Sequence, residues 1–507
     1  MSDLKLYDTT LRDGAQTHRV NFSLRDKLEI AKLLSGLGFD YIEGGWPFSN
    51  RMDREFFRKV RGLNLKARVA AFGMTAKSSD AVEDKNLNVL AGSGADVLTI
   101  FGKSWDLHVT GVLRLGPGEY LDAIRESLRF LKQSGREVIY DAEHFFDGYK
   151  GNAVYAMKTL EAAAKHADVI VLCDTNGGCL PSEVFEITKR VSGEIEKPLG
   201  IHCHNDGGLA LANTLAAIDA GAAHVQGTVN GLGERCGNLD LLELVPSLHK
   251  KGFGLSVDMG RLTEVSGMVE RISGIRVPEN KPYVGRYAFA HKGGVHSDAS
   301  LKVRNSYEHI EPEFVGNKRW FPISEQSGRS ILVAEARRYG FVLGKEDAAV
   351  KSLLAGVKKA GDVGDSQLYL LLNKKLAGGR EPFEVLEREI IDRFAGKPKA
   401  FLKVMAKGKV FDEVSEGDGP VNAIDLALKK VLRGVYPEMD TIRLLDYRVT
   451  LPVAETGTEA WVIVFIEFGS NGEKWTSVAR DTDIIRASER ALMDGYKYYI
   501  LRKPENR

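Results

Sequence analysis

Cysteine is scarce in this chain. Its 507 residues include four cysteines, Cys173, Cys179, Cys203 and Cys236, with no Cys-x-x-Cys pair among them. A chain of this length can build cores that need no disulfide, so we expect reduced thiols. Runs of 18 apolar residues are absent, and no basic and apolar signal segment precedes the first predicted strand. These absences predict a cytoplasmic protein that does not span a membrane.

An excess of charge of either sign is also lacking. The chain has 70 Lys and Arg residues against 69 Asp and Glu residues, a net charge of +1. Proteins that bind nucleic acid or anionic membranes through phosphate groups usually carry a broad basic surface, so we expect neither partner. The hydrophobic content of 43% can fill several cores. Length and composition therefore predict a globular protein of about three domains.

Short β-branched runs alternate with amphipathic helical patterns through the first half of the chain. The eight runs are residues 5–8, 41–43, 68–72, 97–101, 138–143, 169–174, 199–204 and 224–229. Eight strand–helix units predict an α/β fold, a closed parallel TIM (β/α)8 barrel over residues 1–260. An open doubly wound sheet is the alternative.

Two histidines stand two residues apart at the end of the seventh predicted strand, in the segment GIHCHND at 200–206. Alternate residues of a strand point to the same face, so His202 and His204 are predicted to lie ~6.6 Å apart and to converge on one ion. Asp13 follows the first strand and Asn238 follows the eighth. Barrel closure brings strands one, eight and seven side by side, which predicts that these four residues are neighbours.

Two imidazoles and a carboxylate leave coordination positions open for substrate or water, as a catalytic metal site requires. The mixed nitrogen and oxygen set suits zinc, manganese, cobalt or magnesium. The alternative interpretation is a pair of buried, hydrogen-bonded histidines without a metal.

Charged residues beside the predicted metal site suggest acid–base and electrostatic roles. Arg12 adjoins Asp13, where a permanent cation could stabilise an enolate or alkoxide; the alternative is an ion pair with Glu43 or Glu143. Glu143 ends the fifth predicted strand and could transfer a proton or bind water, with structural pairing to Arg12 as the alternative.

The glycine-rich segment 227–238, GTVNGLGERCGN, follows the eighth strand. Its glycine spacing does not match the dinucleotide-binding fingerprint, so we expect a tight loop over the site instead. Cys236 within it could be a nucleophile, but a small buried cysteine is the favoured interpretation.

Beyond the barrel, residues 261–378 are predicted to form helical linker or lid subdomains. Residues 379–507 contain a duplication with a spacing of 64 residues. Phe411, Val414, Ala423, Ala427 and Leu428 recur as Trp475, Val478, Ala487, Ala491 and Leu492. Each copy reads as strands followed by a helix, without a cluster of catalytic residue types, which predicts an α+β regulatory domain.

Several motifs together resemble one enzyme family. The segments DTTLRDG at 8–14, HCHND at 202–206 and GLGERCGN at 231–238 resemble the acetyl-CoA-dependent synthases that act on 2-oxo acids: isopropylmalate, homocitrate and citramalate synthases. The segments 417–423 and 483–488 resemble their regulatory domain. RDGAQT at 12–17, IEGGWP at 42–47 and DAEHFFDGYK at 141–150 look most like the citramalate branch, because isopropylmalate synthases usually carry Glu where Ala15 stands.

The resemblance implies roles for particular residues. Asp13, His202 and His204 would bind a divalent metal, with Asn238 at or near it. Catalytic roles would fall to Arg12, Glu143, His296 and Tyr307. Substrate contacts would come from Arg12, Gln16, Glu43, Thr175 and Asp298. His296, Asp298 and Tyr307 would reach the site of the other subunit in a homodimer.

The resemblance also implies a reaction and its control. It predicts condensation of acetyl-CoA, as co-substrate, with pyruvate, and regulation by isoleucine at the C-terminal domain. A 2-isopropylmalate synthase that accepts 2-oxoisovalerate is the alternative, and a non-catalytic amino-acid sensor is a second one. A hydroxymethylglutaryl-CoA lyase would end soon after the barrel, so the additional ~200 residues argue against it.

Overall fold

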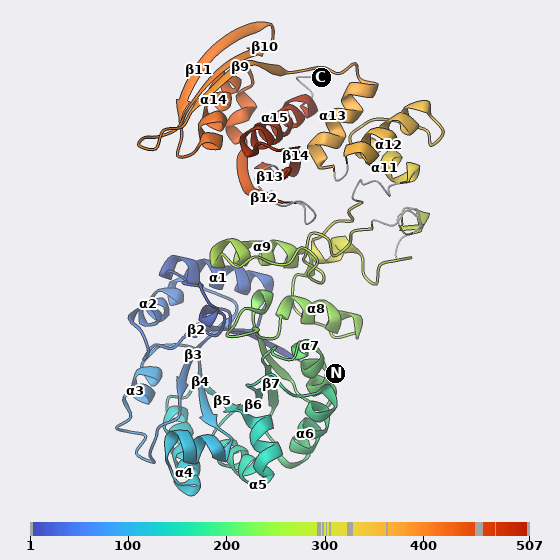
Figure 1. The fold of residues 1–507 in the computed structure, drawn as a ribbon. Helices are drawn as coiled ribbons and strands as arrows, with labels where there is room; N and C mark the ends of the chain where they lie inside the picture. Colours follow the sequence, from blue (N-terminus) through green and yellow to red (C-terminus); the bar gives the residue numbers. More distant parts are fainter. Residues whose placement is uncertain are drawn as a thin grey trace. The chain divides into compact units, whose positions relative to one another are not determined.

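The computed structural model describes residues 4–291, 296, 299–300, 302–303, 306–321, 328–360, 363–451, 460–471 and 473–503 (Figure 1). Asp298 lies outside these residues. The chain divides into two compact units, residues 1–289 with 310–318, and residues 290–309 with 319–507. In the part of the chain described, no helix combines the length and the apolar character needed to cross a bilayer.

A closed barrel of eight strands forms the centre of the first unit, which confirms the predicted fold. The strands are β1 (Lys5–Asp8), β2 (Tyr41–Gly45), β3 (Arg68–Met74), β4 (Val97–Lys103), β5 (Glu137–Glu143), β6 (Val169–Asp174), β7 (Leu199–Cys203) and β8 (His224–Gly227). All neighbouring strands are parallel, and β1 pairs with both β2 and β8 to close the ring. Asp8 pairs in register with Gly227, so the segment before Asp13 lies beside the end of β8.

Helices surround this barrel (Figure 1). They are α1 (Leu24–Leu37), α2 (Arg51–Val60), α3 (Lys85–Ala91), α4 (Pro117–Lys132), α5 (Phe145–Ala164), α6 (Pro181–Glu194), α7 (Ala210–Asp219) and α8 (Leu241–Lys250), followed by α9 (Leu262–Ser273). Local signals set their ends. Ser23 and Asp26 form a capping box at the start of α1, and Gly38 ends it in a left-handed conformation with φ of 105°.

Buried side chains fill the interior of the barrel. A separate buried cluster consists of Tyr7, Tyr41, Ala70, Val97, Ile139, Val169, Val171 and Cys173. These residues come from strands β1 to β6. Active sites of this fold lie at the carboxyl ends of the strands, where the predicted site residues stand.

The eighth strand is shorter than predicted. It ends at Gly227, because residues Val229–Gly231 form a 3-10 turn in which Asn230 has a φ of 60°. Asparagine tolerates this left-handed conformation better than most residues. His204 also lies just past the end of β7, where its backbone pairs with Asn238 in an antiparallel bridge.

The second unit begins with helices and continues with the predicted duplication. Its helices α11 (Arg329–Arg338), α12 (Ala348–Ala360) and α13 (Asp365–Leu376) precede two three-stranded antiparallel sheets. The first sheet contains β9 (Phe383–Ile391), β10 (Lys399–Ala406) and β11 (Lys409–Glu416), followed by α14 (Pro420–Val435). The second contains β12 (Arg443–Thr450), β13 (Val462–Ser470) and β14 (Glu473–Asp481), followed by α15 (Ile484–Arg502). Each copy is thus three strands and a helix.

Candidate metal centre and active site

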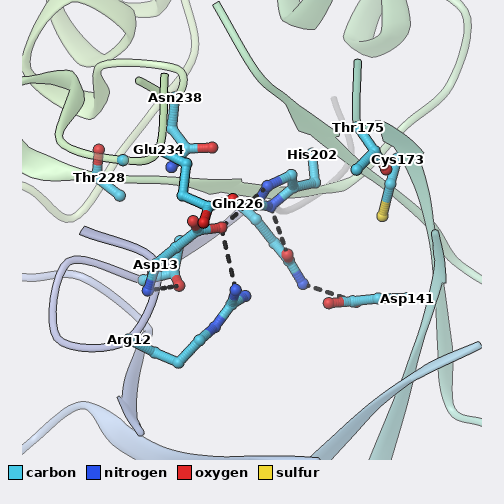
Figure 2. A network of polar contacts seen from close by, with 12 residues as sticks. Arg12, Asp13, Asp141, Cys173, Thr175, His202, Gln226, Thr228, Glu234 and Asn238 are labelled. Atoms are coloured by element: carbon cyan, nitrogen blue, oxygen red, sulfur yellow. Dashed lines mark hydrogen bonds and ion pairs between the residues drawn. The ribbon is translucent and has the colours of Figure 1, made fainter. Parts of the chain in front are cut away.

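Asp13, His202 and His204 converge at the carboxyl end of the barrel. Each is buried and offers a ligand atom, and these atoms all lie within 4.8 Å of one another. His202 Nε2 is 3.4 Å from Asp13 Oδ2, and the two imidazole rings are 5.1 Å apart between their centres. Figure 2 shows Asp13 and His202 facing each other beside Asn238. The three residues thus form a candidate metal site, as the sequence predicts.

Three polar atoms at this site are buried without a hydrogen-bond partner in the described part of the chain: Asp13 Oδ1, His204 Nδ1 and Asn238 Oδ1. Asn238 donates from Nδ2 to the carbonyl oxygen of Leu232 at 3.0 Å, which leaves its Oδ1 as the free end. A buried acceptor without a partner costs about 1–3 kcal/mol, so such atoms are rare unless something binds them. A divalent cation is a partner that oxygen and nitrogen atoms of this kind accept, and the donor set of Asp13, His202 and His204 therefore fits the metal that the resemblance implies.

The protonation states favour metal binding. Burial, together with the charge of His202, lowers the pKa of His204 to about 3, which keeps its imidazole neutral with a free lone pair. Burial alone would raise the pKa of Asp13, but the positive charge of Arg12, the hydrogen bond with His202 and the charges of the two histidines together hold this pKa well below its usual range. Burial by itself would lower the pKa of His202, but the hydrogen bond to Asp13 and the negative charges of Asp13 and Asp141 together raise it above its usual value. Asp13 is consequently a carboxylate beside one neutral imidazole.

Arg12 is held in place by Glu43 and by an aromatic ring. Its Nε lies 2.6 Å from Glu43 Oε2, and its guanidinium carbon is 3.8 Å from the centre of the Phe72 ring. Glu43 is fully buried and also accepts hydrogen bonds from Tyr7 at 2.7 Å and Thr9 at 2.5 Å. Of the two carboxylates considered as ion-pair partners, Arg12 therefore contacts Glu43. The role of Glu43 in substrate binding stays a prediction.

Glu143 pairs with a residue that sequence reasoning missed, Lys103 at the end of β4. The Lys103 ammonium also lies 5.5 Å from the centre of the Phe101 ring. Phe101 in turn stacks on Phe72, with 5.4 Å between ring centres. The strand β4 extends two residues beyond the predicted run 97–101, and Lys103 is its last residue.

The glycine-rich loop after β8 ties the ends of several strands together. Arg235 donates to the backbone oxygen of Thr175 at 2.8 Å and pairs with Asp206 at 2.7 Å. A Cβ on Gly233 would overlap the side-chain amide of Asn238, so glycine is required for this approach. Cys236 is exposed, which corrects the expectation that it is buried. It stands in a loop turned toward solvent rather than in a strand.

The remaining residues with predicted substrate or catalytic roles lie at other places in the structure. Thr175 is half-buried at the end of β6, and its hydroxyl accepts a hydrogen bond from the backbone of His144 at 2.8 Å. Gln16 is exposed in the turn after Asp13. His296 and Tyr307 belong to the second unit, where their rings stack with centres 4.5 Å apart.

Two further buried polar residues were not foreseen. Asp141 in β5 and Gln226 in β8 form a hydrogen-bonded chain that ends on His202 (Figure 2). Asp141 did carry a signal, since it stands two residues before Glu143 and so points to the same face of its strand. Gln226 carried none.

Comparisons with known proteins agree with this architecture. The HMGL-like family model matches residues 3–269. The model described as homocitrate synthase post-HMGL domain-like matches residues 283–365, and the LeuA allosteric (dimerisation) domain matches residues 362–500. Together these matches extend over nearly the whole chain.

Relatives of known name match along the full length. An (R)-citramalate synthase of Sulfolobus acidocaldarius is 45% identical, covering 98% of this chain and 97% of that protein. An (R)-citramalate synthase of Aquifex aeolicus is 42% identical over 99% and 98%. A 2-isopropylmalate synthase of Methanocaldococcus jannaschii is 32% identical over 98% and 95%. The chain therefore belongs to the (R)-citramalate synthase family of acetyl-CoA-dependent condensing enzymes.

Proposed function

We propose that this chain condenses acetyl-CoA with pyruvate and hydrolyses the thioester, which yields (R)-citramalate and free CoA for isoleucine biosynthesis. The observation that carries the proposal is the buried set Asp13, His202 and His204, with unpartnered ligand atoms, in a chain 45% identical to an (R)-citramalate synthase. A divalent ion held there, with Asn238 beside it, would act as a Lewis acid toward the carbonyl group of the 2-oxo acid. Manganese, magnesium, zinc and cobalt all suit its mixed nitrogen and oxygen donors.

Arg12 is suited to stabilise negative charge as it develops. When the methyl carbon of acetyl-CoA bonds to the keto carbon of pyruvate, the keto oxygen becomes an alkoxide. Arg12 stands 3.1 Å from Asp13, next to the candidate ligands, and Glu43 and Phe72 hold its guanidinium in one orientation. A fixed cation loses little free energy to reorganisation during the reaction, so it stabilises the charged state effectively.

Glu143 is the candidate for proton transfer. It is about one quarter exposed at the end of β5, where a substrate could reach it, and the Lys103 ammonium holds it. We propose that Glu143, assisted by His296 and Tyr307 of the partner subunit, moves the proton taken from the acetyl methyl group. Water then attacks the thioester carbonyl, the carbon–sulfur bond breaks, and CoA leaves as the thiol.

Substrate binding and regulation complete the proposal. Gln16, Glu43, Thr175 and Asp298 would contact substrate together with Arg12. The match to the LeuA allosteric (dimerisation) domain supports a homodimer. We further propose that isoleucine binds the duplicated module of residues 379–507, joined to the barrel through residues 261–378, and inhibits the enzyme.

Thiol release from acetyl-CoA tests the proposal directly. The acceptors are pyruvate, 2-oxobutyrate and 2-oxoisovalerate, each with and without a chelator, and Asp13→Ala measures the background. We expect the highest kcat/KM with pyruvate and loss of release with the chelator. A preference for 2-oxoisovalerate would favour 2-isopropylmalate synthase, the name of the 32% identical relative. Absence of thiol release with every acceptor would favour the alternative of a non-catalytic amino-acid sensor.

A further inference from the structure

A chain of hydrogen bonds connects His202 to a buried carboxyl group across the barrel. His202 Nδ1 lies 2.9 Å from Gln226 Oε1, and Gln226 Nε2 donates to Asp141 Oδ1 at 3.0 Å (Figure 2). All three side chains are buried, with exposed fractions of 5% or less. Gln226 is fully buried on β8, between His202 on β7 and Asp141 on β5. Such a chain is costly to bury unless each member is satisfied.

The direction of the hydrogen-bonded chain is set by Asp141 in its carboxylate form. A carboxylate accepts hydrogen bonds and does not donate them, so Asp141 selects the amide nitrogen of Gln226. The oxygen of Gln226 then faces His202, which must carry a proton on Nδ1. Burial raises the pKa of Asp141 to about 7, and in either protonation state an oxygen remains that can accept this hydrogen bond.

This arrangement determines the state of the other ring nitrogen of His202, Nε2. His202 Nε2 faces Asp13 at 3.4 Å, on the side of the candidate ion. With a proton held on Nδ1, the imidazole offers the lone pair of Nε2 to an ion that replaces the hydrogen bond between Nε2 and Asp13. Without Gln226 the opposite tautomer becomes available, in which Nε2 carries the proton and donates it to Asp13 in a hydrogen bond. That hydrogen bond would engage both His202 Nε2 and the Asp13 oxygen, and neither atom would be free to bind the ion.

We propose that Gln226 and Asp141 are positioning residues that fix the tautomer and ring orientation of His202 for metal binding. This inference rests on the proposed metal site. Outer partners of metal-bound histidines commonly change metal affinity 10–100-fold when removed. A merely structural role would lower the stability of the barrel without changing the affinity of the folded protein.

The experiment measures Mn²⁺ binding to the full-length, metal-free protein from the electron paramagnetic resonance signal of free Mn²⁺, without turnover. We expect Gln226→Leu to raise the Kd about 10–100-fold. Asp141→Leu frees the amide to rotate and should raise the Kd by less. Asp141→Asn keeps a carbonyl oxygen that can accept from Gln226, so its Kd should stay within about twofold of wild type.

His224→Leu is the matched control. His224 stands two residues before Gln226 on the same face of β8, it is buried, and neither ring nitrogen has a hydrogen-bond partner in the described part of the chain. Its replacement should leave the Kd unchanged. Any loss of affinity common to this variant and Gln226→Leu would reflect general disturbance of the strand and would contradict the inference.

Each outcome decides between the claims. A folded Gln226→Leu variant with a Kd within twofold of wild type overturns the inference. If that variant does not fold, equal affinities of Asp141→Leu and Asp141→Asn overturn it, and weaker binding by Asp141→Leu alone supports it. If the wild-type protein binds no Mn²⁺, the proposed metal site itself is wrong. If the wild type and all variants bind Mn²⁺ equally tightly, the metal site stands and only the positioning role of Gln226 and Asp141 is wrong.

Discussion

The guanidinium carbon of Arg12 lies 3.8 Å from the centre of the Phe72 ring. The guanidinium lies over the ring while its Nε donates to Glu43 at 2.6 Å. A planar guanidinium can stack and form directed hydrogen bonds at the same time, and an ammonium cannot. The role of Arg12 should therefore depend on its shape as well as its charge.

Arg12→Lys tests this dependence. The variant keeps a positive charge but loses the Nε hydrogen bond and the stacking, so we expect kcat to fall roughly 10²–10³-fold with little change in fold. Steady-state thiol release with pyruvate measures it. Arg58→Lys is the control, because Arg58 is exposed and pairs with Glu55 on the same helix. Near-normal kcat in Arg12→Lys would show that charge alone suffices.

Asp13→Ala should abolish turnover, by at least about 10³-fold, because it removes the only charged ligand of the proposed site. Arg12 keeps its ion pair with Glu43 in this variant, so the protein should remain folded. Circular dichroism and thiol release measure the two effects separately. Asp219→Ala, which removes an exposed ion pair with Lys251, should change neither. A folded Asp13→Ala enzyme with wild-type turnover would refute the ligand role.

Asp8 should make stability depend on pH. Burial raises its pKa from 3.8 to about 7, so the folded state binds this proton more tightly than the unfolded state. The stabilisation is complete below about pH 4 and is lost as the pH rises through about 7. In Asp8→Asn this contribution is absent, so the free energy of unfolding of the variant relative to wild type should rise between about pH 4 and 7 and stay constant above.

Urea unfolding at several pH values measures this difference. Asp80→Asn, at an exposed loop position, is the control and should follow the wild-type curve. Parallel pH dependences for Asp8→Asn and wild type would contradict the assignment.

Gly495 allows α15 to pack closely on the second sheet of the duplicated module. A Cβ at this position would overlap the ring of Phe468 on β13, and Trp475 donates to the Gly495 carbonyl oxygen at 3.1 Å. Gly495→Ala should therefore destabilise the protein by about 1–3 kcal/mol. Gly434→Ala on α14 meets no atom within 4 Å and should stabilise it by about 0.4–1 kcal/mol. Calorimetry measures the thermal unfolding midpoint of each variant. Equal midpoints for Gly495→Ala and Gly434→Ala would contradict the packing argument.

The barrel and the residues of the candidate metal site were predictable because strand patterns and strand order indicate them. Eight β-branched runs mark the strands, and the spacing of His202 and His204 follows strand alternation. Asp13 joins them through barrel closure, which follows from counting the strands. Only short segments were misjudged, such as the end of β8, where the conformation of Asn230 decides and composition does not.

The supporting contacts were less predictable because they depend on side chains that meet across the barrel. Gln226 bonds to residues on two other strands, and nothing in its sequence neighbourhood indicates which residues it faces. The pairing of Arg12 with Glu43 rather than Glu143 likewise depends on side-chain reach. Lys103 pairs with Glu143 instead, from a strand that extends two residues beyond its predicted end.

Anomalous X-ray diffraction from crystals grown with Mn²⁺ tests the central claim most directly. We predict one strong manganese peak per chain at the barrel mouth, ~2.0–2.3 Å from atoms of Asp13, His202 and His204. Absence of a peak there, in crystals of a preparation that still releases CoA from acetyl-CoA and pyruvate after chelation, would contradict the account.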